Sequence, residues 1–122
     1  MSLSLAEICV LNGFSVTEHE VRTEDGYLLT LHRIAAEIET PEFLEEKTVR
    51  GPPVLFQHGL LDSAAGICCD GPDSLAFYMA DLGFDVWMGN SRGNRYSKNH
   101  RYLEATQEEF WNFSFYEMGK FD

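Results

Sequence analysis

Two short apolar runs that each end at a glycine constrain the fold of this chain more than any other feature. Residues 54–59 read Val-Leu-Phe-Gln-His-Gly, and residues 84–89 read Phe-Asp-Val-Trp-Met-Gly. Each run has the length and composition of a buried strand. A long loop over 60–73, rich in small and polar residues, and a helix separate the two runs. This order predicts a parallel βαβ unit with a right-handed crossover.

The helix of this unit is predicted from its end signals. Asp73 or Ser74 supplies an N-cap, and Gly83 stops the helix after Leu82. Its apolar residues are candidates for burial against the sheet: Leu75, Phe77, Tyr78, Met79 and Leu82.

An antiparallel hairpin is predicted before this unit. Residues 14–22 alternate between apolar and polar, residues 27–34 favour strand, and the turn at 23–26 carries an Asp-Gly pair. The glutamate-rich stretch 37–50 reads as a solvated connection, and residues 107–121 as a final helix with several aromatic residues. The fold class is therefore α/β.

Composition limits the partners of the chain. A net charge of -11 argues against nucleic acid and against electrostatic docking on anionic membranes. The three cysteines, Cys9, Cys68 and Cys69, form no metal-binding pattern and are expected to be free thiols. With 44% hydrophobic residues over 122 positions, the chain can build the core of one domain. No apolar run is long enough for a membrane span, and the N-terminus does not resemble a signal peptide.

A strand that ends in His-Gly and turns into a loop is the setting of the oxyanion hole in α/β-hydrolases. Backbone N–H groups in that loop stabilise the negative charge that develops on the carbonyl oxygen during acyl transfer. We expect the Leu60 N–H to be such a donor, with Gly59 giving access to the backbone and Gln57 and His58 supporting the loop. His-Gly alone also fits a simple corner after a strand, so the motif leaves both interpretations open.

The histidines are interpreted as structural. A general base needs a nucleophile within hydrogen-bonding reach, and none is evident beside His58, which is expected to fix the loop instead. The other histidines, His19, His32 and His100, have no partner that the sequence identifies.

Residues 89–93, Gly-Asn-Ser-Arg-Gly, match the spelling of a nucleophile elbow, which makes Ser91 the alternative nucleophile. An elbow leads directly into a helix, whereas residues 94–101 are polar and typical of a loop. The segment is therefore interpreted as a structural loop held by hydrogen bonds of Arg92, and no nucleophile is assigned within the chain.

Several segments together resemble the acid lipase family of α/β-hydrolases, which includes gastric lipase, lysosomal acid lipase and steryl ester hydrolases. The matching segments are residues 23–27, 55–63, 74–77, 83–94 and 109–118. The resemblance runs from about Ile8 to Asp122. It implies an oxyanion N–H at Leu60, a structural loop at 90–94, and a nucleophile elbow, acid, histidine and lid beyond Asp122. The sequence departs from the family pattern in the acidic stretch 37–46 and at Cys68-Cys69.

The resemblance implies that residues 1–122 form the N-terminal part of a single α/β-hydrolase domain. The whole enzyme would hydrolyse neutral lipid esters, triacylglycerols or steryl esters, through a serine acyl-enzyme without metal or cofactor. The resemblance to this family also implies a secreted, lysosomal, or lipid-droplet or membrane-associated location, which the residues themselves do not indicate. These residues alone are expected to be inactive and to self-associate through the sheet edge at the strand before His58. The alternatives are another α/β-hydrolase chemistry, a non-catalytic interaction protein with half the fold, and a small esterase that uses Ser91.

Overall fold

The computed structural model describes residues 3–36 and 51–122, so the solvated connection predicted over 37–50 lies outside the described residues. The helices and strands are α1 (Leu5–Leu11), β1 (Phe14–Arg22), β2 (Tyr27–Ala36), β3 (Pro53–Phe56), α2 (Leu75–Asp81), β4 (Asp85–Met88), β5 (Asn99–His100) and α3 (Phe115–Phe121). Short 3₁₀ helices add η2 (Ala64–Cys68), η3 (Gly71–Asp73) and η4 (Glu108–Trp111).

The strands form one mixed sheet in the order β1-β2-β4-β3, with β5 paired to β2. β1 and β2 are the predicted antiparallel hairpin, and β3 and β4 are the predicted parallel pair, with Val54 opposite Val86. The link between the two halves is the antiparallel pairing of β2 with β4, where Ile34 lies opposite Val86. The α/β class, the hairpin and the βαβ order are therefore confirmed.

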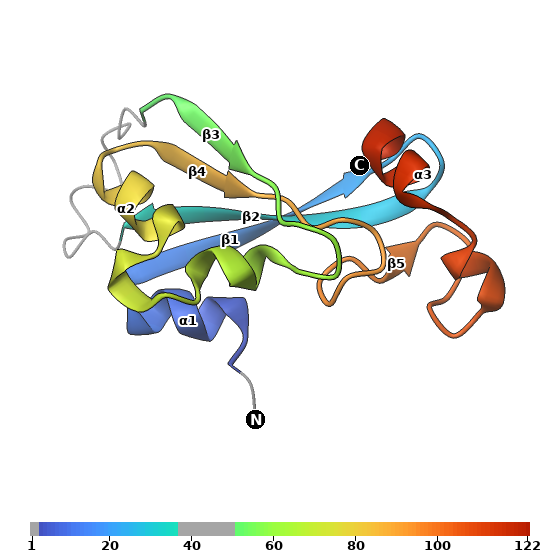
Figure 1. Ribbon diagram of the computed structural model, residues 1–122, viewed down its shortest axis with the longest axis horizontal. Coiled ribbons are helices and arrows are strands. Elements are labelled where there is room, and N and C mark those ends of the chain that lie inside the picture. Colours follow the sequence, from blue (N-terminus) through green and yellow to red (C-terminus); the bar gives the residue numbers. More distant parts are fainter. Residues whose placement is uncertain (1–2, 37–50) are drawn as a thin grey trace.

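The main core lies between one face of the sheet and the helical segments α1, η2 and α2, whose buried residues form one cluster with those of the strands. Figure 1 shows α1 below β1 and α2 at the left end of β2. Side chains alternate between the two faces of a strand, so one set of positions on all four strands points to these helices. The buried core residues are Leu5, Cys9, Phe14, Ile34, Ala64, Cys68, Ala76, Phe77, Val86 and Met88. The cysteines are free, with Cys9 and Cys68 buried and Cys69 exposed.

The burial predicted for α2 is partly wrong. Phe77 is fully buried, together with Ala76, but Leu75, Tyr78 and Leu82 are 54%, 58% and 57% exposed. A helix of only seven residues buries one narrow face, so its other apolar residues stay in solvent. Ser74 occupies the predicted N-cap position, but its hydroxyl donates to the Gly71 carbonyl rather than capping the helix.

The single helix predicted over 107–121 is also wrong. The chain forms the 3₁₀ helix η4, passes through an extended segment, and only then begins α3. The break occurs because Ser114 is extended and caps α3, where it exchanges hydrogen bonds with Glu117 in a capping box. The aromatic residues therefore belong to two short helices that approach the sheet separately.

An N-terminal helix, α1, was not predicted from the sequence. Its start is another capping box, in which Ser4 and Glu7 bond reciprocally. None of the described helices has the length and apolar character that crossing a bilayer would require.

Candidate functional site: the turn that follows strand β3

The predicted oxyanion loop begins where β3 ends, at Phe56, earlier than the strand end predicted at 59. Gly59 and Asp62 close a four-residue turn, in which the Asp62 N–H donates to the Gly59 carbonyl at 3.2 Å. Leu61 has a φ of 64°, the left-handed value that a type II turn requires at its third residue. We call residues 59–62 the 59–62 turn.

The 59–62 turn projects into solvent with a free backbone donor. In the described part of the chain, no hydrogen-bond acceptor lies within reach of the Leu60 N–H. The side chains of Leu60 and Leu61 are 74% and 98% exposed, and a Cβ added to Gly59 would meet no atom within 4 Å. The turn therefore presents an unpaired N–H beside open space, as an oxyanion donor requires.

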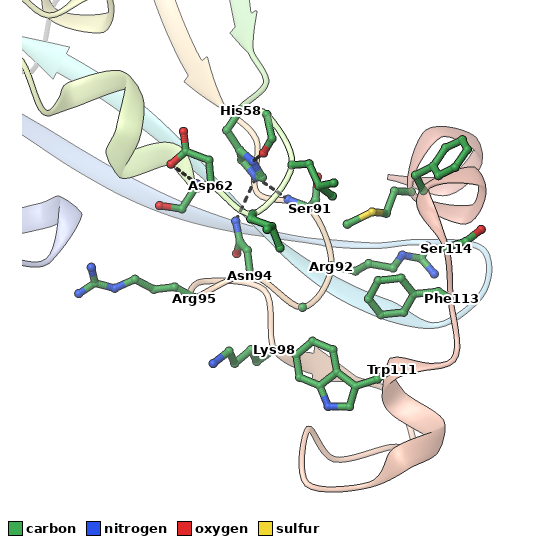
Figure 2. Close-up of a pocket in the computed structure, with 17 residues that line it drawn as sticks. His58, Asp62, Ser91, Arg92, Asn94, Arg95, Lys98, Trp111, Phe113 and Ser114 are labelled. Carbon is green, nitrogen blue, oxygen red and sulfur yellow. Dashed lines mark hydrogen bonds between the residues drawn. The ribbon is translucent and has the colours of Figure 1, made fainter.

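His58 is bonded on both sides of its ring. Its Nδ1 lies 2.7 Å from the Gly59 carbonyl, and its Nε2 accepts hydrogen bonds from the Ser91 N–H at 3.0 Å and from Asn94 Nδ2 at 3.1 Å. Figure 2 shows these contacts converging on the ring. Since Nε2 accepts, the ring proton sits on Nδ1 and is donated to the carbonyl. His58 thus supports the turn, and its acceptor nitrogen is already occupied.

Ser91 lies beside His58 without the geometry of a nucleophile. His58 accepts from the Ser91 backbone N–H, whereas the Ser91 hydroxyl receives a hydrogen bond from Gln57 Nε2 at 2.9 Å. No helix follows directly: the next element along the chain is the short strand β5. The Gln57 side chain also covers Gly89, where a Cβ would clash with its Oε1.

Arg92 holds the loop after β4 through hydrogen bonds, as predicted. Its buried guanidinium binds Asp25 in the hairpin turn and Asp122 at the end of α3, and it stacks 4.1 Å from the centre of the Tyr27 ring. Burial alone would raise the pKa of Asp25, but hydrogen bonds from Arg92 and Thr23 outweigh it and lower that pKa.

An open pocket of about 810 Å³ lies between the 59–62 turn and the segment that leads into α3. Figure 2 shows Trp111 and Phe113 on the opposite side of this pocket from His58. Its apolar lining residues are Leu60, Leu61, Trp111, Phe113, Phe115 and Met118. The free Leu60 N–H therefore stands at the edge of a pocket that suits an apolar ligand.

The remaining histidines have partners that the sequence did not identify. His32 is buried between Asn90 and Glu18, His100 accepts from two backbone N–H groups, and His19 contacts Thr17. All three contacts fit the predicted structural role.

Sequence reasoning also missed the roles of Asn90 and Asn94. Position was the available signal for Asn90, because a polar residue directly after the glycine that ends a parallel strand lies at the edge where α/β proteins bind ligands. Asn94 lies in the same loop.

A mixed sheet of this order, with a His-Gly turn at the carboxyl end of a parallel strand, defines the N-terminal part of an α/β-hydrolase fold. Residues 5–71 match the family described as "Partial alpha/beta-hydrolase lipase region". The chain belongs to this family.

Three relatives illustrate the similarity. Lipase 1 of Drosophila melanogaster is 44% identical over 99% of this chain and 25% of the relative. Human Lipase member M is 46% identical over 98% of the chain and 28% of the relative. Human lysosomal acid lipase/cholesteryl ester hydrolase is 47% identical over 99% of the chain and 30% of the relative. The chain thus spans about a quarter to a third of the length of these relatives.

Proposed function

We propose that residues 1–122 are the N-terminal part of a serine lipase that hydrolyses neutral lipid esters, with the Leu60 N–H as one oxyanion donor. The observation that carries the proposal is the free Leu60 N–H on the hydrogen-bonded 59–62 turn, at the edge of an apolar pocket. Membership in a lipase family supports ester hydrolysis, and the name of one relative, lysosomal acid lipase/cholesteryl ester hydrolase, supports cholesteryl esters as one class of substrate.

The chemistry proceeds through an acyl-enzyme. A serine hydroxyl attacks the ester carbonyl carbon, the alcohol leaves with a proton, and water then releases the fatty acid. Each addition places negative charge on the carbonyl oxygen, which the Leu60 N–H stabilises together with the N–H of the residue after the nucleophile. We place that nucleophile beyond Asp122, because the hydroxyl of Ser91 is bonded to Gln57, whereas His58 Nε2 accepts from the backbone N–H of Ser91 and not from its hydroxyl.

The first test compares residues 1–122 with the full-length protein that contains them. We expect the purified full-length protein to hydrolyse a short-chain p-nitrophenyl ester and residues 1–122 to show no activity above buffer. Activity in residues 1–122 that disappears in Ser91→Ala would overturn this proposal and make Ser91 the nucleophile. A full-length protein without esterase activity would favour a non-catalytic role.

The second test removes the proposed donor and preserves the turn. Proline has no N–H and is favoured at the second position of a type II turn, which Leu60 occupies. In the full-length protein, Leu60→Pro is expected to lower kcat by about 10²- to 10³-fold, the usual cost of losing one oxyanion donor. Leu60→Ala keeps the N–H and is the matched control, so its kcat should stay within about threefold of the wild type. Equal losses in the two variants would rule out the backbone donor.

A further inference from the structure

The structure assigns Asn90 and Asn94 as positioning residues that fix both ends of the 59–62 turn and thereby aim the Leu60 N–H. This inference rests on the proposed function for its consequence in catalysis, although the contacts themselves do not. We call the two residues the asparagine cradle.

Asn90 connects the sheet to the far end of the turn. It is 2% exposed, and its Oδ1 accepts from the Ala64 N–H and from Asn94 Nδ2, both at 3.0 Å. Its Nδ2 donates to the Thr30 carbonyl and to His32 Nδ1, both at 2.9 Å. The backbone partners admit only one orientation of the amide, since an N–H must meet oxygen and a carbonyl must meet nitrogen. Every hydrogen-bonding position of this amide is therefore used.

Asn94 connects Asn90 to the near end of the turn. Its Oδ1 accepts from the Tyr96 N–H at 2.9 Å, which directs its Nδ2 toward both Asn90 Oδ1 and His58 Nε2. That contact keeps His58 Nε2 an acceptor and leaves the ring proton on Nδ1, beside the Gly59 carbonyl. Asn94 and the Ser91 N–H, which donates to the same nitrogen at 3.0 Å, therefore together fix the tautomer through which His58 contacts the turn.

Packing cannot supply this positioning, because the turn has almost no packed side chains. Leu60 and Leu61 are largely exposed, and the space around the Gly59 Cα is open. Hydrogen bonds link the residues on either side of the turn, His58 and Ala64, to the loop that follows β4. One partner at each side belongs to the asparagine cradle, next to the Ser91 N–H at His58 and the core packing of Ala64, so we infer that the two amide side chains help to set the direction of the Leu60 N–H.

The direct test is amide hydrogen exchange, which reads the turn without reference to activity. Asn94→Ala in the full-length protein should accelerate exchange in the peptide that covers residues 59–64 by about three- to tenfold, as expected for lost hydrogen bonds. Asn90→Ala removes the acceptor for the Ala64 N–H, so it should also accelerate exchange in this peptide, and it serves as the second variant if Asn94→Ala does not fold.

Ser97→Ala is the matched control. Ser97 is fully buried in the same loop and has two hydrogen bonds, to the Asn90 carbonyl and from the Thr30 N–H, but it does not contact the turn. We expect exchange in 59–64 to change less than about twofold in this variant. Unchanged exchange in both asparagine variants, or equal acceleration in Ser97→Ala, would overturn the inference.

Kinetics then separate this inference from the proposed function. Loss of donor alignment should lower kcat for an ester about tenfold or more in Asn94→Ala and leave KM within about twofold, the pattern of an interaction made in the transition state. Faster exchange with unchanged kcat would support the cradle's hold on the turn but reject Leu60 as a donor. Lower kcat without faster exchange would reject the cradle as a positioning device.

Discussion

At the scale of single residues, asparagine side chains of the same loop donate to the rings of His58 and His32. His58 Nε2 and His32 Nδ1 both accept from asparagine side chains, so each ring carries its proton on the other nitrogen. Burial lowers the pKa of His32, and the nearby carboxylate of Glu18 only partly opposes this effect. The native arrangement therefore requires an unprotonated His32.

His32 should make the fold less stable in mild acid. Because its folded pKa is lowered, its contribution is complete above the unfolded pKa of about 6.5 and declines as pH falls below that value. We expect the free energy of unfolding, measured by urea titration, to fall more between pH 7.5 and pH 5 in the wild type than in His32→Gln. An equal decline of the unfolding free energy in the two proteins would show that His32 does not contribute to this pH dependence.

The position of the turn could be predicted from sequence, but the side chains that support it could not. Gln57, His58 and Gly59 are adjacent and follow a recognisable strand, so they form a local motif. Asn90 binds Thr30 and Ala64, which are 60 and 26 residues away along the chain. The order of the strands brings those partners together, and local sequence patterns do not reveal that order.

At the scale of elements, periodicity in the sequence predicted the strands, whereas capping residues determine where the short helices α1 and α3 begin. The hairpin and the two parallel strands were found because alternation and glycine ends are strong signals. The helix over 107–121 was wrong because the aromatic pattern outweighed the Ser114–Glu117 capping box, which marks a new start. The same motif at Ser4–Glu7 marks α1. Both errors came from a signal that was present in the sequence.

The hairpin turn and α3 should depend on one side chain. Arg92 is fully buried and joins Asp25 to Asp122, so Arg92→Met leaves two carboxylates without their partner. Breaking a buried pair in this way costs about 3–5 kcal/mol. The control Arg33→Met removes a more exposed partner of Asp85 and should cost about 1 kcal/mol or less. Urea titrations that show a similar loss of unfolding free energy in Arg92→Met and Arg33→Met would contradict a special role for Arg92.

At the scale of the whole molecule, the described sheet is covered unevenly. α1, η2 and α2 pack on one face, whereas Leu55 on the other face is 64% exposed and Arg33 stacks on Trp87 near the surface. β3 is the outer strand beside β4 in the described order. An exposed edge with an apolar neighbour is a template for pairing with another chain.

We therefore expect residues 1–122 to self-associate through β3. Sedimentation velocity should show dimers or larger species whose proportion rises with protein concentration. Leu55→Lys places a charge on the edge strand and should shift the population toward monomer. Leu82→Lys alters a similarly exposed leucine at the end of α2 and should leave the association unchanged. A wild-type chain that sediments as a single monomer at all concentrations would contradict this prediction.

The hydrogen bonds at His58 and Ala64 also have a consequence for protein engineering. Residues 59–63 therefore form a loop whose two ends, His58 and Ala64, are fixed by hydrogen bonds to other parts of the chain. Randomised libraries of that length can therefore be grafted between the stems while Asn90 and Asn94 stay constant. Such libraries would vary the exposed side chains and preserve the hydrogen bonds at both stems, so under the proposed function they are a starting point for altering selectivity.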